Sequence, residues 1–333
     1  MPDPSPAGRP CVFVTRRLPG DAVSRLAAHA DIDQWTAELP PPYEELTRRA
    51  ADAEALVCLL TDRIDAALLD AASRLRAICN VAAGYDNIDL AAASKRGIPV
   101  GNTPGVLTET TADLAFALML ACARRIVEAD RFVRDGLWRA WDPSLLLGYD
   151  LHGATLGIVG FGKIGQAVAR RAHGFDMRVL YASTSAVDTA APAERVALDA
   201  LLRTADFVSL HVPLTPATAK IIGDPQLRSM KPGAILVNTA RGGVIDQAAL
   251  VRALEEGWIA GAGLDVAAVE PIPRGDALLR APNITLLPHI GSASHATRER
   301  MAALAIDNCL AALRGERMPH CLNPDVYGPG RIH

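Results

Sequence analysis

The sequence lacks the features that mark several classes of protein. Its 333 residues carry 34 Lys and Arg against 37 Asp and Glu, so it has no basic excess of the kind that nucleic-acid-binding surfaces show. No apolar run approaches the roughly 20 residues that a membrane-spanning helix requires. The six cysteines are scattered, with no C-x-x-C pair and no metal-site spacing, which is typical of reduced thiols in a cytoplasmic protein. We therefore expect a cytoplasmic protein without a metal, a nucleic-acid partner or a membrane partner.

What the sequence does contain is a regular alternation of strand-like and helix-like segments. CVFVT at 11–15 precedes the helical pattern DAVSRLAAHA, and ALVCLL at 55–60 precedes IDAALLDAASRL. The alternation resumes in the second half of the chain with the apolar runs LGIVG, MRVLYAS, DFVSLHVP, GAILVNTA, IAGAGLDV and ITLLPH. Such alternation favours parallel sheets covered by helices. With a length that suggests two domains, it predicts an α/β protein of two doubly wound, Rossmann-like parallel sheets.

Two long helical patterns complete this outline. The alanine-rich stretch 108–134 predicts one continuous helix, packed either between two bodies or within one core. The stretch TRERMAALAIDNCLAALRG predicts a last helix that ends at Gly315, because glycine commonly follows a helix C-terminus.

A glycine-rich turn lies between one of these strands and the next helix. Gly160, Gly162 and Gly165 have G-x-G-x-x-G spacing, after the apolar strand 156–159 and before a helix expected at 166–173. In this context the pattern predicts a dinucleotide site, with the pyrophosphate at the positive end of the helix. A plain strand–helix turn is the alternative.

The loop after the following strand has no acidic residue at its start. An NAD site usually places an Asp or Glu there, which accepts hydrogen bonds from the adenosine ribose hydroxyls. Here the strand runs into Ser183, Thr184 and Ser185, whose hydroxyls can donate to a phosphate. We therefore expect NADP(H) to be favoured, with NAD(H) usable. These could also be ordinary turn residues, and the loop itself contains no Arg or Lys.

Four charged or titratable residues follow predicted strands nearer the C-terminus. Arg241 follows AILVN, Asp265 and Glu270 follow IAGAG, and His289 follows NITLL. Ligands of open α/β sheets bind at such strand ends. Each residue also has an ordinary explanation, as a surface cation, a buried structural carboxylate, a loop charge or a structural histidine. Their occurrence at successive strand ends of a dinucleotide-binding sheet favours a catalytic set.

These motifs together resemble those of the D-2-hydroxyacid dehydrogenases, and most of all the glyoxylate/hydroxypyruvate reductases. The similarity runs from about residue 79 to the C-terminus and includes LHGATLGIVGFGKIGQAVARRA, NTARGGVIDQAALVRAL, IAGAGLDV and LLPHIGSAS. The resemblance implies a substrate-binding, flavodoxin-like domain formed by 1–106 plus 295–333. It implies an NAD(P)-binding Rossmann domain formed by 107–294, with the active site in the cleft between the two.

The resemblance also implies roles for three of the residues at the strand ends. His289 would supply a proton to the substrate carbonyl, and Glu270 would pair with it, since an adjacent carboxylate favours the imidazolium form. Arg241 would bind the substrate carboxylate and keto oxygen through charge-assisted hydrogen bonds of its planar fork. The expected reaction is the reduction of glyoxylate and hydroxypyruvate to glycolate and D-glycerate.

Further substrate contacts are implied outside this set. Backbone N–H groups at Ala83 and Gly84 would hold the substrate carboxylate, where small side chains let the main chain approach closely. A tryptophan matching Trp141 reaches, in the resembling reductases, into the active site of the partner subunit, which implies a homodimer. Ordinary aromatic packing is the alternative for Trp141 and for nearby Trp138.

Cofactor contacts are implied along much of the second domain. They involve Gly160, Phe161, Gly162, Lys163, Ile164, Gly165, Ser183, Thr184, Ser185, Thr111, Val212, Pro213, Ala217, Thr239, Ala240, Arg241, Asp265, His289 and Gly291. Two other functions stay open. One is a dehydrogenase for a different substrate, such as a larger 2-keto acid or a 2-keto sugar acid. The other is a nucleotide-sensing scaffold that recruits partners.

Overall fold

The chain divides into two compact units. This computed structural model describes residues 8–187 and 192–328. Met1–Leu107 and Ala293–His333 make up the first unit, and Thr108–Ser292 makes up the second. The domain boundaries expected from the sequence were near 106 and 295.

The first unit is built on a five-stranded parallel sheet with the order β2-β1-β3-β4-β5, which is the flavodoxin-like order. Its strands are β1 (Cys11–Val14), β2 (Asp31–Gln34), β3 (Ala55–Cys58), β4 (Ala77–Asn80) and β5 (Val100–Gly101). Its helices are α1 (Ala22–Ala27), α2 (Tyr43–Asp52), α3 (Ala66–Ala71), α4 (Leu90–Lys95), α11 (His295–Leu313) and the 3-10 turn η4 (Pro324–Tyr327).

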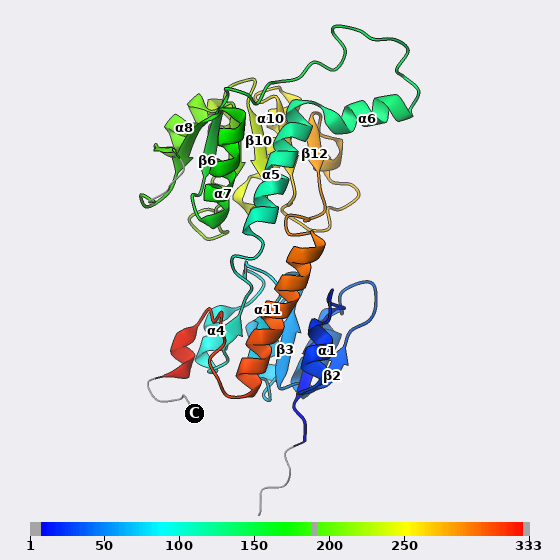
Figure 1. Cartoon of the computed structure of the whole chain (residues 1–333), viewed down its shortest axis with the longest axis vertical. Coiled ribbons are helices and arrows are strands. Elements are labelled where there is room, and N and C mark those ends of the chain that lie inside the picture. The colour runs from blue at the N-terminus through cyan, green and yellow to red at the C-terminus, as the bar shows by residue number, and fades with distance from the viewer. Residues whose placement is uncertain (1–7, 188–191, 329–333) are drawn as a thin grey trace, which may run out of the picture. The chain divides into compact units, whose positions relative to one another are not determined.

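Apolar side chains cover both faces of this sheet, as a parallel sheet between helices requires. Val12 and Val14 of β1 pack with α1 and α11, whereas Phe13 between them packs with α2, α3 and α4. Figure 1 shows α11 lying along the sheet beside α1. Because α11 belongs to this unit, the chain returns to the first sheet after completing the second.

The second unit contains a seven-stranded parallel sheet with the order β12-β11-β10-β9-β6-β7-β8. From β8 to β11 this is the Rossmann order, in which the direction of strand addition reverses between β6 and β9. The strands are β6 (Thr155–Val159), β7 (Arg178–Ala182), β8 (Glu194–Arg195), β9 (Phe207–Leu210), β10 (Ile235–Asn238), β11 (Gly261–Leu264) and β12 (Ile284–Leu286).

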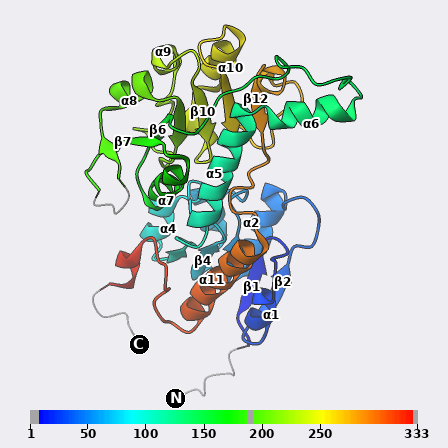
Figure 2. The ribbon, with the colours of Figure 1, turned by 45° about the horizontal axis from the view of Figure 1, so that its top comes forward.

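Helices cover both faces of this second sheet. α5 (Thr108–Ala123) and α7 (Lys163–Ala172) lie across one face, and α8 (Leu198–Thr204), α9 (Asp224–Ser229) and α10 (Gln247–Glu255) cover the other (Figures 1 and 2). The remaining elements are α6 (Ile126–Arg134) and the 3-10 turns η1 (His173–Phe175), η2 (Gly242–Val244) and η3 (Ala277–Arg280). Both sheets therefore confirm the predicted class of two doubly wound α/β halves.

The single helix predicted over 108–134 is wrong, because the structure breaks it into α5 and α6. Arg125 has a left-handed backbone with φ of 52°. The carbonyl of Ala123 accepts a hydrogen bond from the Tyr149 N–H at 2.9 Å. A Cβ on Gly148 would lie 2.1 Å from that same oxygen, so only glycine lets the returning chain come this close. The break therefore depends on a segment more than twenty residues away.

The predicted end of the last helix is confirmed, while two strands were missed. Gly315 has φ of +76°, directly after Arg314 caps α11. The edge strands β2 and β8 have the sequences DIDQ and ER, which carry no apolar pattern. Within the described residues, no helix is long and apolar enough to cross a membrane.

Candidate active site

The glycine turn lies after β6, where the strand order of the second sheet reverses. Gly160 has φ of +90°, and a Cβ there would lie 2.6 Å from the His211 carbonyl oxygen. A Cβ on Gly165 would lie 2.3 Å from the Gly160 oxygen, whereas one on Gly162 would meet nothing within 4 Å. The first and third glycines are therefore required by packing, and the second leaves the backbone open to a ligand. This geometry fits the pyrophosphate of a dinucleotide.

The helix after the turn presents its positive end to the same space. α7 begins at Lys163 with Gly162 as its cap, so its first N–H groups have no partner within the helix. Phe161 is 1% exposed and stacks on Tyr181 of β7, with ring centroids 4.0 Å apart. The buried ring anchors the turn, while Lys163 is exposed and Ile164 is partly buried.

The hydroxyl-rich loop after β7 has a basic neighbour that the sequence analysis missed. Arg195 donates from Nη2 to the carbonyls of Ser183 and Thr184, at 3.0 and 3.1 Å. It is brought there by the pairing of β8 with β7, in which Tyr181 lies opposite Arg195. Adjacent Glu194 forms an ion pair with Arg178 at 2.7 Å. Only strand pairing could have identified Arg195, because it lies outside the loop in sequence.

His289 and Glu270 form a close pair. His289 Nδ1 lies 2.7 Å from a Glu270 carboxylate oxygen, and both side chains are partly exposed. Burial raises the pKa of Glu270, but its hydrogen bond to His289, the charges of His289 and Arg241 and the Ala267 N–H outweigh burial and place that pKa below its ordinary value. Glu270 is therefore ionised at neutral pH. The pairing is made through Nδ1, so Nε2 takes no part in it.

Asp265 holds the backbone around His289 in place. It is 1% exposed, and its two oxygens accept the N–H groups of Ile290 and Gly291, each at 2.7 Å. Its carbonyl also accepts the His289 N–H at 2.9 Å. Burial raises the pKa of Asp265, opposed by those two N–H groups and by His289. His289 has a left-handed φ of 57°, so these bonds hold an uncommon backbone conformation.

Arg241 is positioned by the turn after β10. Buried Asn238 accepts the Ala240 N–H and donates to the Arg241 carbonyl, both at 2.9 Å. A Cβ on the next residue, Gly242, would lie 1.9 Å from the Ala267 backbone. The turn therefore packs directly against the loop that leads to Glu270, and the charge of Arg241 helps to lower the Glu270 pKa.

Several other expected cofactor residues lie near these loops. A Cβ on Gly160 would lie 2.8 Å from Val212, and one on Gly291 would lie 3.5 Å from Thr111. Thr239 is buried at the end of β10, next to partly buried Ala240. Pro213 and Ala217 are exposed in the segment after β9.

The other residues expected to bind substrate belong to segments outside these loops. Ala83 and Gly84 follow β4 in the first unit, and both are partly exposed. Trp141 is 80% exposed in the segment after α6. No group of three His, Cys, Asp or Glu side chains suited to a metal occurs in residues 8–187 and 192–328.

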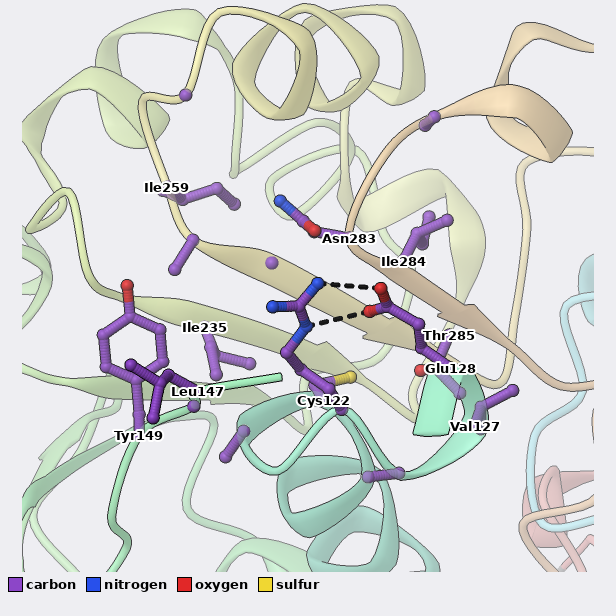
Figure 3. Close-up of a pocket in the computed structure, with 18 of the residues that line it drawn as sticks. Cys122, Val127, Glu128, Leu147, Tyr149, Ile235, Ile259, Asn283, Ile284 and Thr285 are labelled. Atoms are coloured by element: carbon purple, nitrogen blue, oxygen red, sulfur yellow. Dashed lines mark hydrogen bonds and ion pairs between the residues drawn. The ribbon is translucent and has the colours of Figure 1, made fainter. Parts of the chain in front are cut away.

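A separate pocket of about 640 Å³ lies near the amino ends of strands in the second sheet. Figure 3 shows it, with Cys122, Glu128, Tyr149 and Thr285 among the residues around it. Ile235 and Ile284, the first residues of β10 and β12, also line it. The pocket therefore lies at the amino ends of the strands, whereas the glycine turn, Arg241 and Asp265 lie at the carboxyl ends.

Comparisons with known proteins agree with this geometry. Residues 116–291 match the model of the D-isomer specific 2-hydroxyacid dehydrogenase, NAD binding domain. The glyoxylate reductase of Korarchaeum cryptofilum is 55% identical over 322 residues, covering 96% of this chain and 97% of the relative.

Solved structures are also similar over nearly the whole chain. A protein from Thermus thermophilus has a TM-score of 0.89 at 50% identity, covering 94% of this chain and 99% of its own. The NADPH-dependent glyoxylate/hydroxypyruvate reductase from Sinorhizobium meliloti, in complex with NADP and malonate, has a TM-score of 0.85 at 33% identity, covering 95% and 98%.

Proposed function

Because the chain belongs to the family of D-isomer specific 2-hydroxyacid dehydrogenases, which are oxidoreductases, we propose that it reduces glyoxylate and hydroxypyruvate to glycolate and D-glycerate. The observation that carries this proposal is the His289–Glu270 pair at 2.7 Å, in the same unit as Arg241 and the glycine turn. Close relatives named glyoxylate reductase support the choice of substrate.

The proposed chemistry assigns one task to each side chain. A bound nicotinamide cofactor would supply the hydride. His289 would donate a proton to the carbonyl oxygen, and the Glu270 carboxylate would stabilise the imidazolium beforehand. Arg241 would bind the substrate carboxylate and polarise the keto group. The N–H groups of Ala83 and Gly84 would hold the same carboxylate, so both units would contribute to substrate binding. Asp265 would act by holding the His289 backbone.

We further propose that NADP(H) is the favoured coenzyme and that NAD(H) remains usable. The hydroxyls of Ser183, Thr184 and Ser185 and the guanidinium of Arg195 would receive the 2′-phosphate, and no carboxylate occupies positions 182–187 to repel it. Arginine suits this task because its fork binds phosphate through charge-assisted hydrogen bonds. The family supports NAD(P) use, and the choice between the two coenzymes is the proposal.

The proposed assembly is a homodimer, with Trp141 reaching the partner's active site. Its support is the number of exposed apolar side chains on α6 and the segment that follows, which are Ile126, Val127, Val133, Leu137, Trp138, Trp141, Leu145, Leu147 and Tyr149. Extensive exposed apolar surface commonly marks protein interfaces. The six cysteines are free thiols, which fits the proposed cytoplasmic location.

The direct test is a panel of 2-keto acids assayed with NADPH and NADH in parallel. We expect coenzyme absorbance to fall on addition of glyoxylate or hydroxypyruvate. Faster turnover of a larger 2-keto acid or a 2-keto sugar acid would change the substrate. A complete lack of turnover with all of them would reject the reductase and favour the scaffold function.

A further inference from the structure

The short loop 82–84, which contains the proposed carboxylate site of the first unit, has all three of its carbonyl groups hydrogen-bonded within that unit. The N–H of Thr103 and the side-chain amides of Asn102 and Asn80 donate to the carbonyls of residues 82, 83 and 84, in that order. The distances are 2.9, 2.7 and 2.9 Å. Every carbonyl of the loop is therefore occupied by a donor from its own unit.

This arrangement determines where the N–H groups of the loop point. In a trans peptide the carbonyl of one residue and the N–H of the next point in opposite directions. The Ala83 N–H therefore points away from Thr103, and the Gly84 N–H points away from Asn102. Neither N–H has an acceptor in the described part of the chain. Two donors are thus held ready for an anion.

The asparagines that hold the loop are themselves fixed by buried contacts. Asn80 is fully buried and Asn102 is 6% exposed. The Asn80 amide also donates to the Asn87 side-chain oxygen at 3.2 Å. Asn87 in turn donates to the carbonyls of Leu59 and Asp62, both at 3.0 Å. The loop after β4 is thereby joined to the loop after β3.

Asn102 is fixed from a second direction by α11. Fully buried Asn308 donates to the Asn102 carbonyl at 3.0 Å. Its own side-chain oxygen accepts the His320 N–H at 3.0 Å. A Cβ on Gly101 would lie 2.7 Å from the Asn308 amide nitrogen. Glycine at 101 is therefore required for the contact that holds Asn102.

We propose that Asn102, with Asn80 behind it, is a positioning residue for the substrate carboxylate. Asn102 orients the peptide that carries the Gly84 N–H, and Asn80 orients the peptide that follows. This inference rests on the proposed reductase function. It predicts that losing either amide weakens substrate binding without affecting the groups that carry out proton transfer. Asn102 has the larger effect, because its peptide carries one of the two donors.

The test compares Asn102→Ala and Asn80→Ala with a matched control in the same unit. Asn323 is also buried and holds the Val100 N–H at 2.8 Å and the Ile98 carbonyl at 3.0 Å, but not the loop. For Asn102→Ala we expect KM for glyoxylate to rise about tenfold or more, the effect of losing one hydrogen bond to a charged group. We expect kcat to stay within about threefold and the Kd of NADPH, measured by fluorescence, to stay unchanged. Asn80→Ala should raise KM less.

The outcomes separate positioning from a merely structural role. Asn323→Ala should lower the melting temperature and leave KM unchanged. Equal KM values for Asn102→Ala and Asn323→Ala, or a fall in kcat without a rise in KM, would overturn the proposal. If Asn102→Ala does not fold, Asn102→Ser, which is too short to reach the Ala83 carbonyl, replaces it.

The failure of the reductase function would be seen separately. In that case the wild-type protein would turn over no 2-keto acid. Calorimetric titration of the NADPH complex with oxalate would still measure anion binding at the loop. Weaker oxalate binding to Asn102→Ala than to Asn323→Ala supports the positioning role, and equal binding rejects it.

Discussion

Replacing Glu270 with Gln tests how the proton donor is maintained. The substitution keeps the size of the side chain and removes its charge, 2.7 Å from His289 Nδ1. At an effective dielectric constant of about 20, a pair of charges at contact is worth about 4 kcal/mol. Both side chains are partly exposed, so solvent screening reduces this to about 1–1.5 kcal/mol. Such an energy corresponds to a factor of about five to ten in rate.

We therefore expect kcat of Glu270→Gln at neutral pH to be about five- to tenfold lower than that of the wild type. The reason is that a neutral amide cannot stabilise the positive charge of the proton donor as the carboxylate does. The assay is kcat at neutral pH, with deuterated NADPH to show that hydride transfer limits the rate. Glu316→Gln, which removes a surface ion pair with Arg314, is the control. An unchanged kcat in Glu270→Gln, with hydride transfer rate-limiting, would refute the reasoning.

Contacts in the second unit lead to three more predictions. Arg195→Ala should weaken NADPH binding about tenfold and leave NADH binding within about twofold, because a charge-assisted contact to the 2′-phosphate is lost. Fluorescence titration gives the two Kd values, and Arg203→Ala is the control. Equal losses of affinity for both coenzymes would contradict the prediction. Val133→Glu should convert the proposed dimer to monomers in sedimentation velocity. Leu39→Glu should not, because Leu39 is also exposed but lies in the first unit. A monomeric wild-type protein would disprove the proposed homodimer. The folded-state pKa of Glu270 is lowered, so the contribution of its carboxylate to stability is present above the ordinary carboxyl pKa and is lost as pH falls through the lowered value. The difference in melting temperature between wild type and Glu270→Gln should therefore shrink as pH falls from about 5 to about 3. A constant difference would show that the Glu270 carboxylate is not stabilised in the folded state.

Much of the fold follows from local patterns in the sequence. Short apolar runs between helical segments are sufficient to predict both parallel sheets, and Gly315 marks the end of α11. The helix after the glycine turn begins three residues earlier than expected, at Lys163. The structure shows that Gly165 belongs to the helix and lets it approach the Gly160 carbonyl.

What could not be predicted depends on contacts between distant segments. The break after α5 requires Gly148 and Tyr149 against Ala123, and nothing at 124–125 indicates it. Arg195 reaches the loop after β7 only because a two-residue strand pairs there. Asn102 holds the Ala83 carbonyl from nineteen residues away. In each case the sequence contains the residue but not the pairing that gives it a role.

Substitution of His289 by Ala is the most direct test of the central claim, that an imidazole supported by Glu270 donates the proton in NADP(H)-dependent reduction of a small 2-keto acid. Single-turnover oxidation of NADPH by glyoxylate, followed by coenzyme absorbance, should slow by about 100-fold or more in the variant, while its Kd for NADPH stays close to that of wild type. A rate within about tenfold of wild type, with NADPH still bound, would contradict the account.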